Sequence, residues 1–328
     1  MGTMGTRSRQ VAIDLGSARL RLRDQRQAWS APHVAIVDEE GSLRAWGDEA
    51  LAMAGRLPPR LRLVRPVAAG AVADLPLAAR LLGSALRAAS GKSRRLRGAQ
   101  AVVCVPDHAT SLERHVLRQV CKDAGINQVR SVPHSVAAAV GAGVSGSPAG
   151  ALLVDIGEHR TSASMIALGT ALVTRTVKRG AGSVDTWLMR HAREEHALTI
   201  GARVAEEAKL AAALETGARL PVRGQDRDEG LPRVGELTVA EIRAVLRPVY
   251  EDVARLVTAV LDASPPELVD DVFERGVLLH GGGARLYGLD AHLRQELSMP
   301  VHLVESGADT AVEGAWLLAA EGPVLELA

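Results

Sequence analysis

A hairpin pattern that occurs twice constrains this chain most strongly. The two copies are Val11–Asp24 (VAIDLGSARLRLRD) and Leu152–Leu168 (LLVDIGEHRTSASMIAL). In each, an apolar run ends at an aspartate, a glycine follows two residues later, and a second alternating run returns. These residues are Asp14 and Gly16 in the first copy and Asp155 and Gly157 in the second. The pattern predicts two strands joined by a tight turn, and its repetition predicts a duplicated domain.

Two such turns that face each other would place two carboxylates and several free backbone N–H groups around one cleft. That arrangement suits a metal–polyphosphate ligand. A third segment, Val277–Asp290 (VLLHGGGARLYGLD), predicts a strand, a triple-glycine turn and the start of a helix. Glycines there would let a flat ligand lie against bare backbone. Singly, each pattern also fits an ordinary hairpin or a flexible connection, so their order carries the specificity.

The order of these three segments resembles the actin–Hsp70–hexokinase superfamily, with its first phosphate loop, second phosphate loop and adenosine loop. The segments between them resemble the MreB-like rod-shape cytoskeletal proteins, and the match runs from about Val11 to about Ala320. The resembling segments are Val105–Ala124 (VPDHATSLERHVLRQVCKDA), Ser131–Gly143 (SVPHSVAAAVGAG), Gly201–Ala213 (GARVAEEAKLAAA), Val222–Pro232 (VRGQDRDEGLP) and Ser264–Asp290.

The resemblance implies an α/β, actin-like two-lobed fold built from duplicated ribonuclease-H-like domains, with a nucleotide cleft between them. We expect a first lobe over 1–142 with a small inserted subdomain at about 29–63. A second lobe over 143–304 carries an insert at about 182–237, and 305–328 returns to the first lobe. A chain of 328 residues with 47% hydrophobic residues is long enough for two cores.

Helical spacing of apolar residues predicts helices between the expected strands. Thr110 or Ser111, with Glu113 in the first turn, forms a capping signature before one of them. Small residues over 135–143 predict a closely packed helix that is a candidate hinge between the lobes. The main predicted helices span 75–89, 109–124, 183–196, 202–214 and 241–261.

Composition argues against several classes of protein. A net charge of +1, with one Phe and two Tyr, makes nucleic-acid binding the less favoured function. Cys104 and Cys121 show neither metal spacing nor a disulfide framework, which fits a reducing compartment. No apolar run approaches the roughly 18 residues of a membrane span, and the N-terminus lacks a signal-peptide core. We expect a cytoplasmic protein, with the inner face of the cell membrane as a candidate second location.

The loop Gly91–Gly98 (GKSRRLRG) is basic and contains a single apolar residue. A solvated turn is one interpretation. The other is a membrane contact, in which Lys92, Arg94, Arg95 and Arg97 meet anionic headgroups while Leu96 enters the interface. At about 1 kcal/mol per basic residue, one copy would bind weakly and a filament of many copies strongly.

The resemblance also implies adenine nucleotide, ATP or ADP with Mg²⁺, as the ligand. Asp14 and Asp155 are expected to hold the metal through water. The nucleotide-binding residues implied are Asp14, Gly16, Ser17, Ala18 and Arg19 in the first loop, Asp155, Gly157, Glu158, His159, Arg160 and Thr161 in the second, Glu206 and Lys209 on the ribose and base side, and Gly281, Gly282, Gly283 and Ala284 in the adenosine loop.

The second loop departs from the family pattern DIGGGTT, because this chain has DIGEHRT. Side chains disfavour any positive φ by about 1 kcal/mol or more. Glu158 would repel a phosphate, whereas His159 and Arg160 would attract it. In the first loop, Arg19 replaces a short polar residue, and its guanidinium is predicted either to pair with phosphate or to point to solvent.

The hydrolytic position also departs from the family. His134 stands where the family carries its water-activating glutamate. Neutral imidazole can orient or deprotonate water, but capping or packing at a helix start is the favoured alternative for His134. Lys209 is retained, while its usual glutamate partner two residues on is Ala211.

These features together predict an MreB-like filament subunit that guides cell-wall synthesis and cell shape. Nucleotide binding would be retained or weakened, and the chain would be a degenerate ATPase. By resemblance, its partners are further copies of itself and membrane-associated cell-wall elongation proteins. Two alternatives stay open, namely an active ATPase or sugar-kinase-like enzyme of the same superfamily and a non-polymerising actin-fold adaptor.

Overall fold

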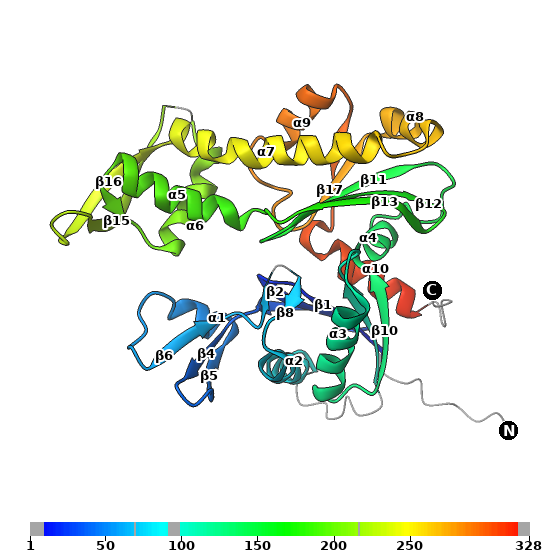
Figure 1. Cartoon of the computed structure of the whole chain (residues 1–328), viewed down its shortest axis with the longest axis horizontal. Helices are drawn as coiled ribbons and strands as arrows, with labels where there is room; N and C mark the ends of the chain where they lie inside the picture. Colours follow the sequence, from blue (N-terminus) through cyan, green and yellow to red (C-terminus); the bar gives the residue numbers. More distant parts are fainter. Residues whose placement is uncertain (1–9, 69, 91–98, 216, 321–328) are drawn as a thin grey trace. The chain divides into compact units, whose positions relative to one another are not determined.

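The computed structural model of the chain describes residues 10–68, 70–90, 99–215 and 217–320 (Figure 1). It divides into two compact units. Of the described residues, the first contains those up to Ala149, the segment Ile166–Leu172 and those from Val304 to Ala320. The second contains Gly150–Met165 and Val173–Leu303. The finer division into inserted subdomains stays a prediction.

The loop predicted to contact a membrane lies outside the described residues. Its positions Lys92, Arg94, Arg95, Leu96 and Arg97 all fall in 91–98, so the membrane contact stays a prediction. Over the described part of the chain, every helix is too short or too polar to cross a bilayer.

The first unit is built on a five-stranded sheet with the order β10-β9-β1-β2-β3. Its strands are β1 (Gln10–Leu15), β2 (Arg19–Arg23), β3 (Ala28–Pro32), β9 (Gln100–Val105) and β10 (Gln128–Pro133). β1 pairs antiparallel with β2 and parallel with β9, and β9 pairs parallel with β10. The carboxyl ends of β1, β9 and β10 therefore share one edge of the sheet.

Helices cover both faces of this sheet, which is why its central strands are almost continuously apolar. The helices are α2 (Leu75–Ser90), α3 (Ser111–Asp123), α4 (His134–Gly141) and α10 (Thr310–Ala320). Val11, Ile13 and Leu15 pack with apolar residues of α2 and α3. On the opposite face α10 contacts β1 and β9, where the Cys104 thiol lies 3.6 Å from the Ala311 carbonyl oxygen. The predicted capping box of Thr110 and Glu113 is present at the start of α3.

A smaller sheet with the order β5-β4-β6 follows β3 in the chain. It consists of β4 (Ala35–Asp38), β5 (Leu43–Trp46) and β6 (Leu61–Val64), and the short helix α1 (Gly47–Ala52) follows β5. Val34, Ile36, Ala45 and Ala50 form its separate core. The chain then returns through the two-residue strands β7 (Val67–Ala68) and β8 (Ala71–Val72).

The second unit repeats the strand order of the first. Its sheet reads β13-β12-β11-β17-β18, made of β11 (Ala151–Ile156), β12 (Thr161–Ala167), β13 (Thr170–Val177), β17 (Val277–His280) and β18 (Val301–Leu303). β11 pairs parallel with β17, and β17 with β18. In each sheet the first strand of the unit is central. The next two strands in the chain lie on one side of it, and two later parallel strands lie on the other. The predicted duplication is confirmed.

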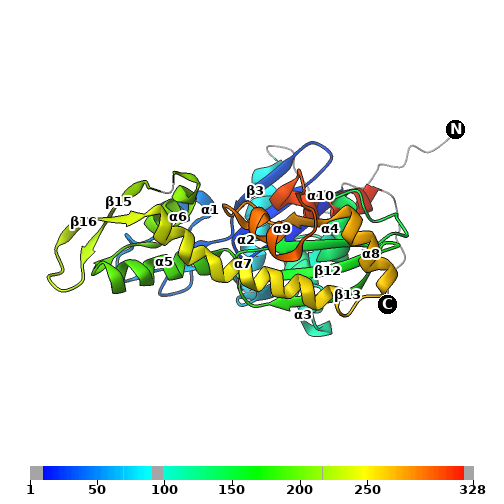
Figure 2. The same ribbon diagram turned by 90° about the horizontal axis from the view of Figure 1, so that it is seen from above.

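The remaining elements of the second unit lie between β13 and β17 or after them. They are α5 (Gly182–Glu195), β14 (Leu198–Thr199), α6 (Ala202–Leu210), a 3-10 turn (Ala211–Ala213), β15 (Arg219–Asp226), β16 (Pro232–Thr238), α7 (Val239–Leu261), α8 (Pro266–Arg275) and α9 (Leu289–Leu297). A second 3-10 turn (Gly307–Asp309) precedes α10 in the first unit. The long helix α7 runs from the end of β16 to the start of α8 (Figure 2). Its apolar face shares one core with Leu152, Val154 and Ile156 of β11.

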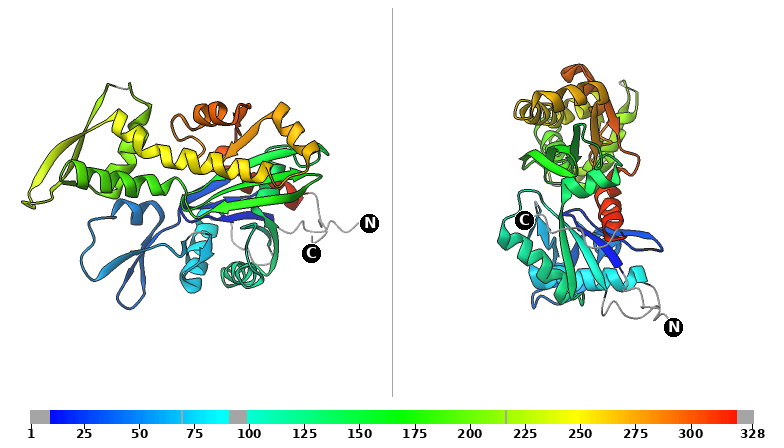
Figure 3. Two further views of the ribbon diagram at one scale, coloured as in Figure 1. Left: turned by 45° about the horizontal axis from the view of Figure 1, so that its top comes forward. Right: turned by 90° about the vertical axis from the view of Figure 1, so that its right-hand side faces the viewer.

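The small residues of α4 pack against α10 within the first unit (Figure 3). A Cβ atom placed on Gly141 would lie 2.0 Å from the Thr310 carbonyl oxygen. One placed on Gly314 would lie 1.8 Å from the Ala137 carbonyl oxygen. The two helices therefore meet backbone to backbone, and this contact accounts for the small side chains predicted for a hinge.

Candidate functional site

The first predicted phosphate turn joins β1 to β2. Asp14 is the fifth residue of β1, and Gly16 follows the strand directly. A Cβ on Gly16 would lie 2.7 Å from the Arg19 carbonyl oxygen. The turn therefore needs glycine because the backbone three residues on approaches so closely.

The carboxylate of Asp14 has an arginine beside it from its own hairpin. Arg21 is the cross-strand neighbour of Asp14, and its Nη1 lies 3.5 Å from Asp14 Oδ2. Its Nε donates a 3.0 Å hydrogen bond to Asp309 Oδ1. Because the Asp14 and Arg21 side chains are each only 13% exposed, this pair competes with any metal-bound water for the carboxylate. The sequence reasoning missed Arg21, although the hairpin register predicts its position.

The backbone of the first turn is held from the neighbouring segments. His33 is buried, its backbone N–H donates to the Ala18 carbonyl at 2.8 Å, and its Nδ1 lies 2.8 Å from the Gly16 carbonyl oxygen. A carbonyl only accepts, so this Nδ1 carries the proton. Burial lowers the pKa of His33 and keeps its ring neutral. Sequence analysis did not single out His33, since it lies outside the repeated hairpin.

The side chains of Ser17 and Arg19 are also engaged within the first unit. Ser17 Oγ accepts from the Gly70 N–H at 3.4 Å, and the Ser17 carbonyl accepts from Arg65 at 3.3 Å. Arg19 Nη2 donates to Ser30 Oγ on β3 at 3.1 Å. The Arg19 side chain thus makes a hydrogen bond to the neighbouring strand, which neither of the two predictions for it included.

His134 is the first residue of α4, at the sheet edge where β1 and β9 also end. Asp107 caps this helix, because the backbone N–H of Ser135 donates to Asp107 Oδ1 at 3.1 Å and the Ser135 hydroxyl donates to the same oxygen. Asp107 therefore supplies a side-chain cap to this helix, and the structural alternative for His134 stays a prediction. A hydrolytic role for His134 stays a prediction.

The second turn has the same backbone design as the first. Asp155 is the fifth residue of β11, and Gly157 follows the strand directly. The Gly157 N–H donates to the Arg160 carbonyl at 2.9 Å, and a Cβ on Gly157 would lie 3.1 Å from that oxygen. The carbonyl three residues later thus approaches the glycine closely in both copies, and more closely in the first.

In the second turn, Glu158, His159 and Arg160 stand where the family pattern has other residues, and none of the three has a left-handed backbone conformation. Leu168, Ala197 and Ser298 are the described non-glycine residues with positive φ. Glu158, His159 and Arg160 therefore do not incur the penalty that a positive φ would carry.

The side chains of this turn differ in what they contact. Glu158 folds back to the start of α5, where a Cβ on Gly182 would lie 2.5 Å from Glu158 Oε1. A carboxylate is favourable at a helix N-terminus. The Thr161 hydroxyl donates to the Arg179 carbonyl at 2.9 Å. Among the described residues, buried His159 Nδ1 and Arg160 Nη1 have no hydrogen-bond partner.

The triple-glycine loop follows β17, beside the end of β11. Asp155 and His280 are register partners, with Oδ1 and Nδ1 3.8 Å apart. Gly281 has φ +90°, and a Cβ there would lie 2.4 Å from Asp155 Oδ1. A Cβ on Gly283 would lie 2.4 Å from Ile156 Cγ2, whereas one on Gly282 would meet nothing within 4 Å. Gly281 and Gly283 are thus fixed by packing, and Gly282 leaves its backbone open.

Ala284 and the two predicted residues of α6 lie in the same unit. Ala284 is buried behind the loop. Lys209 Nζ donates to Asp185 Oδ2 of α5 at 2.9 Å, so Asp185 takes the place of the missing glutamate partner. Burial raises the pKa of Asp185, and Lys209 opposes that rise. Glu206 is exposed. No sequence pattern singled out Asp185.

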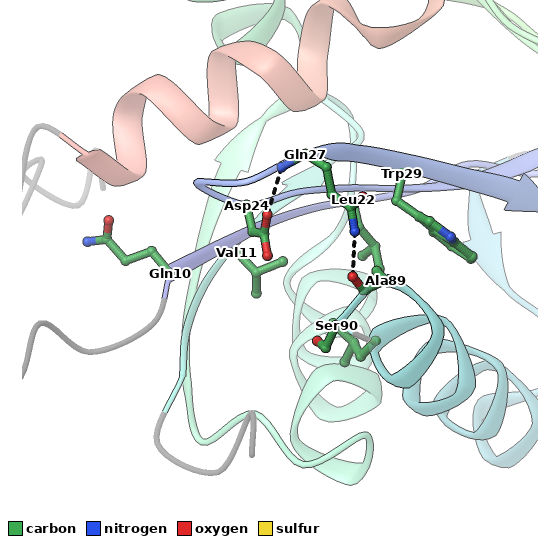
Figure 4. Close-up of a pocket in the computed structure, with 9 residues that line it drawn as sticks. Gln10, Val11, Leu22, Asp24, Gln27, Trp29, Ala89 and Ser90 are labelled. Carbon is green, nitrogen blue, oxygen red and sulfur yellow. Dashed lines mark hydrogen bonds between the residues drawn. The ribbon is translucent and has the colours of Figure 1, made fainter. Parts of the chain in front are cut away.

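A pocket between β1, β2, β3 and α2 is too small to be this site (Figure 4). Gln27, which lines it, donates to the Ala89 carbonyl at 2.5 Å. Its volume is about 20 Å³, which is room for about one water molecule.

Comparisons with known proteins identify the family of this chain. The family model described as MreB/Mbl protein matches residues 8–323. The cell shape-determining protein Mbl of Bacillus subtilis (strain 168) is 30% identical over 315 residues, covering 94% of each chain. The cell shape-determining protein MreB of Escherichia coli (strain K12) is 32% identical over 317 residues, covering 92% of this chain and 90% of that one.

Solved structures show the same fold. MreB5 of Spiroplasma citri, solved with AMPPNP and with ADP, is 26% identical. The AMPPNP-bound structure superposes with a TM-score of 0.90 and covers 97% of each chain. The fold is therefore actin-like, as predicted, and the match over nearly the whole length places this chain in the MreB/Mbl family.

Proposed function

We propose that this protein is an MreB-like filament subunit that binds adenine nucleotide and guides cell shape and cell-wall synthesis. Support for cell shape comes from the two bacterial relatives, both named cell shape-determining proteins. Support for the ligand comes from MreB5, solved with AMPPNP and with ADP.

The observation that carries the nucleotide proposal is the shape of the triple-glycine loop. The backbone of Gly281 and Gly283 packs closely against β11, whereas no described residue other than its chain neighbours lies within 4 Å of the position that a Cβ on Gly282 would take. Bare backbone of this kind lets a flat base lie against it, which supports adenosine as the group bound there. In the second turn, His159 Nδ1 and Arg160 Nη1 have no hydrogen-bond partner among the residues that the structure describes, which supports a phosphate beside them. The adenosine loop and both turns are the residues proposed to hold the nucleotide.

We expect the proposed site to bind its metal ion weakly. Asp14 and Asp155 would hold Mg²⁺ through water, and the ion would neutralise phosphate charge when bound. Asp14 already has Arg21 at 3.5 Å, so a positive charge stands where a second cation has to approach. We therefore expect Mg-nucleotide affinity below that of a relative without this arginine.

Titration calorimetry with Mg-ADP on the Gly282→Leu variant tests the proposal. Since a Cβ at Gly282 meets nothing within 4 Å, the variant should fold normally and lose at least about tenfold in affinity, or about 1.4 kcal/mol. Gly146 is a matched control, because a Cβ there also meets nothing, and Gly146→Leu should bind like the parent. Equal affinities in all three chains would remove the loop from the site.

Hydrolysis is proposed to be weak or absent. His134 replaces the water-activating glutamate expected by resemblance, and Glu158 and His159 change the second turn. Phosphate release should stay near background in the parent and in His134→Glu. Adding Glu158→Gly and His159→Gly should raise it, and the coupling between these changes separates the two causes. Robust release by the parent that is lost in His134→Ala would contradict this part of the proposal.

Self-association and membrane contact complete the proposal. Sedimentation with and without Mg-ATP distinguishes a filament subunit, which pellets, from a non-polymerising adaptor, which does not. Co-sedimentation with anionic vesicles tests the basic loop, where Arg94→Glu, Arg95→Glu and Arg97→Glu together should abolish binding. Added salt should weaken the parent's binding through screening.

A further inference from the structure

Two histidines and one glutamate meet in the second unit, away from both turns and the glycine loop. His191 lies near the end of α5, His196 is its C-terminal cap, and Glu241 is in the first turn of α7. One ligand atom from each lies within 4.8 Å of the others. These elements meet beside β15 and β16 (Figures 1 and 3).

The facing atoms are those that a metal would use. His196 Nε2 lies 2.8 Å and His191 Nε2 3.5 Å from the same oxygen, Glu241 Oε1. A tetrahedral zinc ion with bonds of about 2.1 Å holds its ligand atoms about 3.4 Å apart. The three atoms thus need only small side-chain movements to close around one ion.

The other groups around the cluster hold these ligands in place. Glu241 Oε2 accepts hydrogen bonds from the Thr238 N–H at 2.7 Å and the Thr238 hydroxyl at 2.6 Å, which leaves Oε1 for the cluster. The His196 carbonyl accepts from Arg233. Outer contacts of this kind orient metal ligands in protein sites.

One atom of the cluster is unsatisfied by the protein. His191 Nε2 is buried and has no hydrogen-bond partner among the described residues. A buried polar atom without a partner is uncommon in folded proteins and calls for a bound group. The side chains are 24–29% exposed overall, so an ion can enter from solvent.

We propose that His191, His196 and Glu241 bind one Zn²⁺ ion, with water in the fourth position, and that the ion ties the end of α5 to the start of α7. Two imidazoles and one carboxylate are a donor set that zinc accepts, whereas Mg²⁺ and Ca²⁺ prefer oxygen ligands alone. This site is independent of the nucleotide proposal, since it shares no residue with it.

The test uses the full-length, tag-free chain after removal of metal with a chelator. Equilibrium dialysis should give one Zn²⁺ per chain, and Co²⁺ should give the visible absorption of a tetrahedral site. His191→Gln should lose at least tenfold in zinc affinity. His302, exposed on β18 of the same unit, is the matched control, and His302→Gln should bind like the parent.

A thermal melt gives a second readout. Zinc at ten times its dissociation constant should raise the melting temperature of the parent by about 3 °C and leave His191→Gln unchanged. Absence of one-to-one binding by the parent, or equal binding by the parent and His191→Gln, overturns the proposal.

Discussion

The contact between α4 and α10 allows a sharp prediction about Gly314. A Cβ at this position would lie 1.8 Å from the Ala137 carbonyl oxygen and 2.6 Å from the Gly141 nitrogen. Real Cβ atoms essentially never come closer than 3.0 Å to such atoms, so Gly314→Ala requires about 1.2 Å of separation, the difference between 3.0 and 1.8. α10 cannot retreat freely, because it also contacts β1 and β9.

The size of the effect follows from two opposing terms. Overpacking of a rigid contact typically costs about 1–3 kcal/mol, and the backbone-to-backbone contact places this case near the upper end. Replacing glycine by alanine inside a helix returns about 1 kcal/mol. The free energy of unfolding should therefore fall by about 2 kcal/mol in Gly314→Ala.

Gly83 in α2 is a matched control with the opposite sign. It is also buried in a helix, but a Cβ there would meet Arg87 Nη1 at 3.5 Å and the Ala124 carbonyl oxygen at 3.9 Å, both ordinary contacts. Gly83→Ala therefore keeps only the helical gain and should be more stable than the parent by about 0.5–1 kcal/mol.

Urea denaturation followed by tryptophan fluorescence measures both variants. Trp29, Trp46 and Trp316 lie in the first unit and Trp187 in the second. Since the two units can unfold separately, a Trp187→Phe background makes the signal report the first unit alone. The two midpoints should differ by about 1 M urea. If Gly314→Ala unfolds at the same urea concentration as Gly83→Ala, or later, the packing argument is wrong.

Three further predictions concern charged groups of the two units. Arg21→Leu should raise Mg-ADP affinity in calorimetry by releasing Asp14, whereas Arg23→Leu, whose partner is Glu313, should not. Because burial lowers the folded pKa of His33, only the unfolded chain binds its proton just below pH 6.5, and stability should fall there as pH decreases. His33→Asn should reduce that slope in urea titrations. Lys209→Met should lower the unfolding free energy by about 1–3 kcal/mol by leaving Asp185 unpaired, and Asp185→Leu should restore much of it.

Structural features that depend only on residues close together in the sequence could be predicted. The hairpin strands, the capping box at α3 and the glycine loop all follow from local periodicity and turn chemistry. The end of α6 could not, because alanines favour helix but do not mark where it stops. The expected helix over 202–214 gives way to a 3-10 turn after Leu210.

Contacts between residues far apart in sequence were not predicted. His33 reaches Gly16 across 17 residues, and Lys209 reaches Asp185 across 24. The close contact of Gly314 with α4 is between two segments of the first unit that are far apart in the sequence. Each depends on how elements pack, and periodicity reports only which face of an element is apolar.

The two turns show why a changed pattern need not mean a changed fold. In both copies the carbonyl three residues later approaches the glycine after the aspartate: a Cβ would lie 2.7 Å from the Arg19 oxygen in the first and 3.1 Å from the Arg160 oxygen in the second. The residues between take side chains without left-handed backbone. Replacing glycines in the second turn has therefore altered its charge while its backbone bond from Gly157 to Arg160 closes the turn.

Because the second turn differs from the family in its charged side chains and not in its backbone, we expect the chain to differ from its family in ligand binding rather than in stability. Glu158 lies at the start of α5, so its carboxylate is stabilised there by the helix dipole and does not have to be displaced for the turn to form. Within the described part of the chain, His159 and Arg160 each keep a buried nitrogen that has no hydrogen-bond partner. The departures should appear in phosphate affinity and its dependence on salt, and the unfolding free energy of the second unit should change little when these three side chains are exchanged for the family's residues.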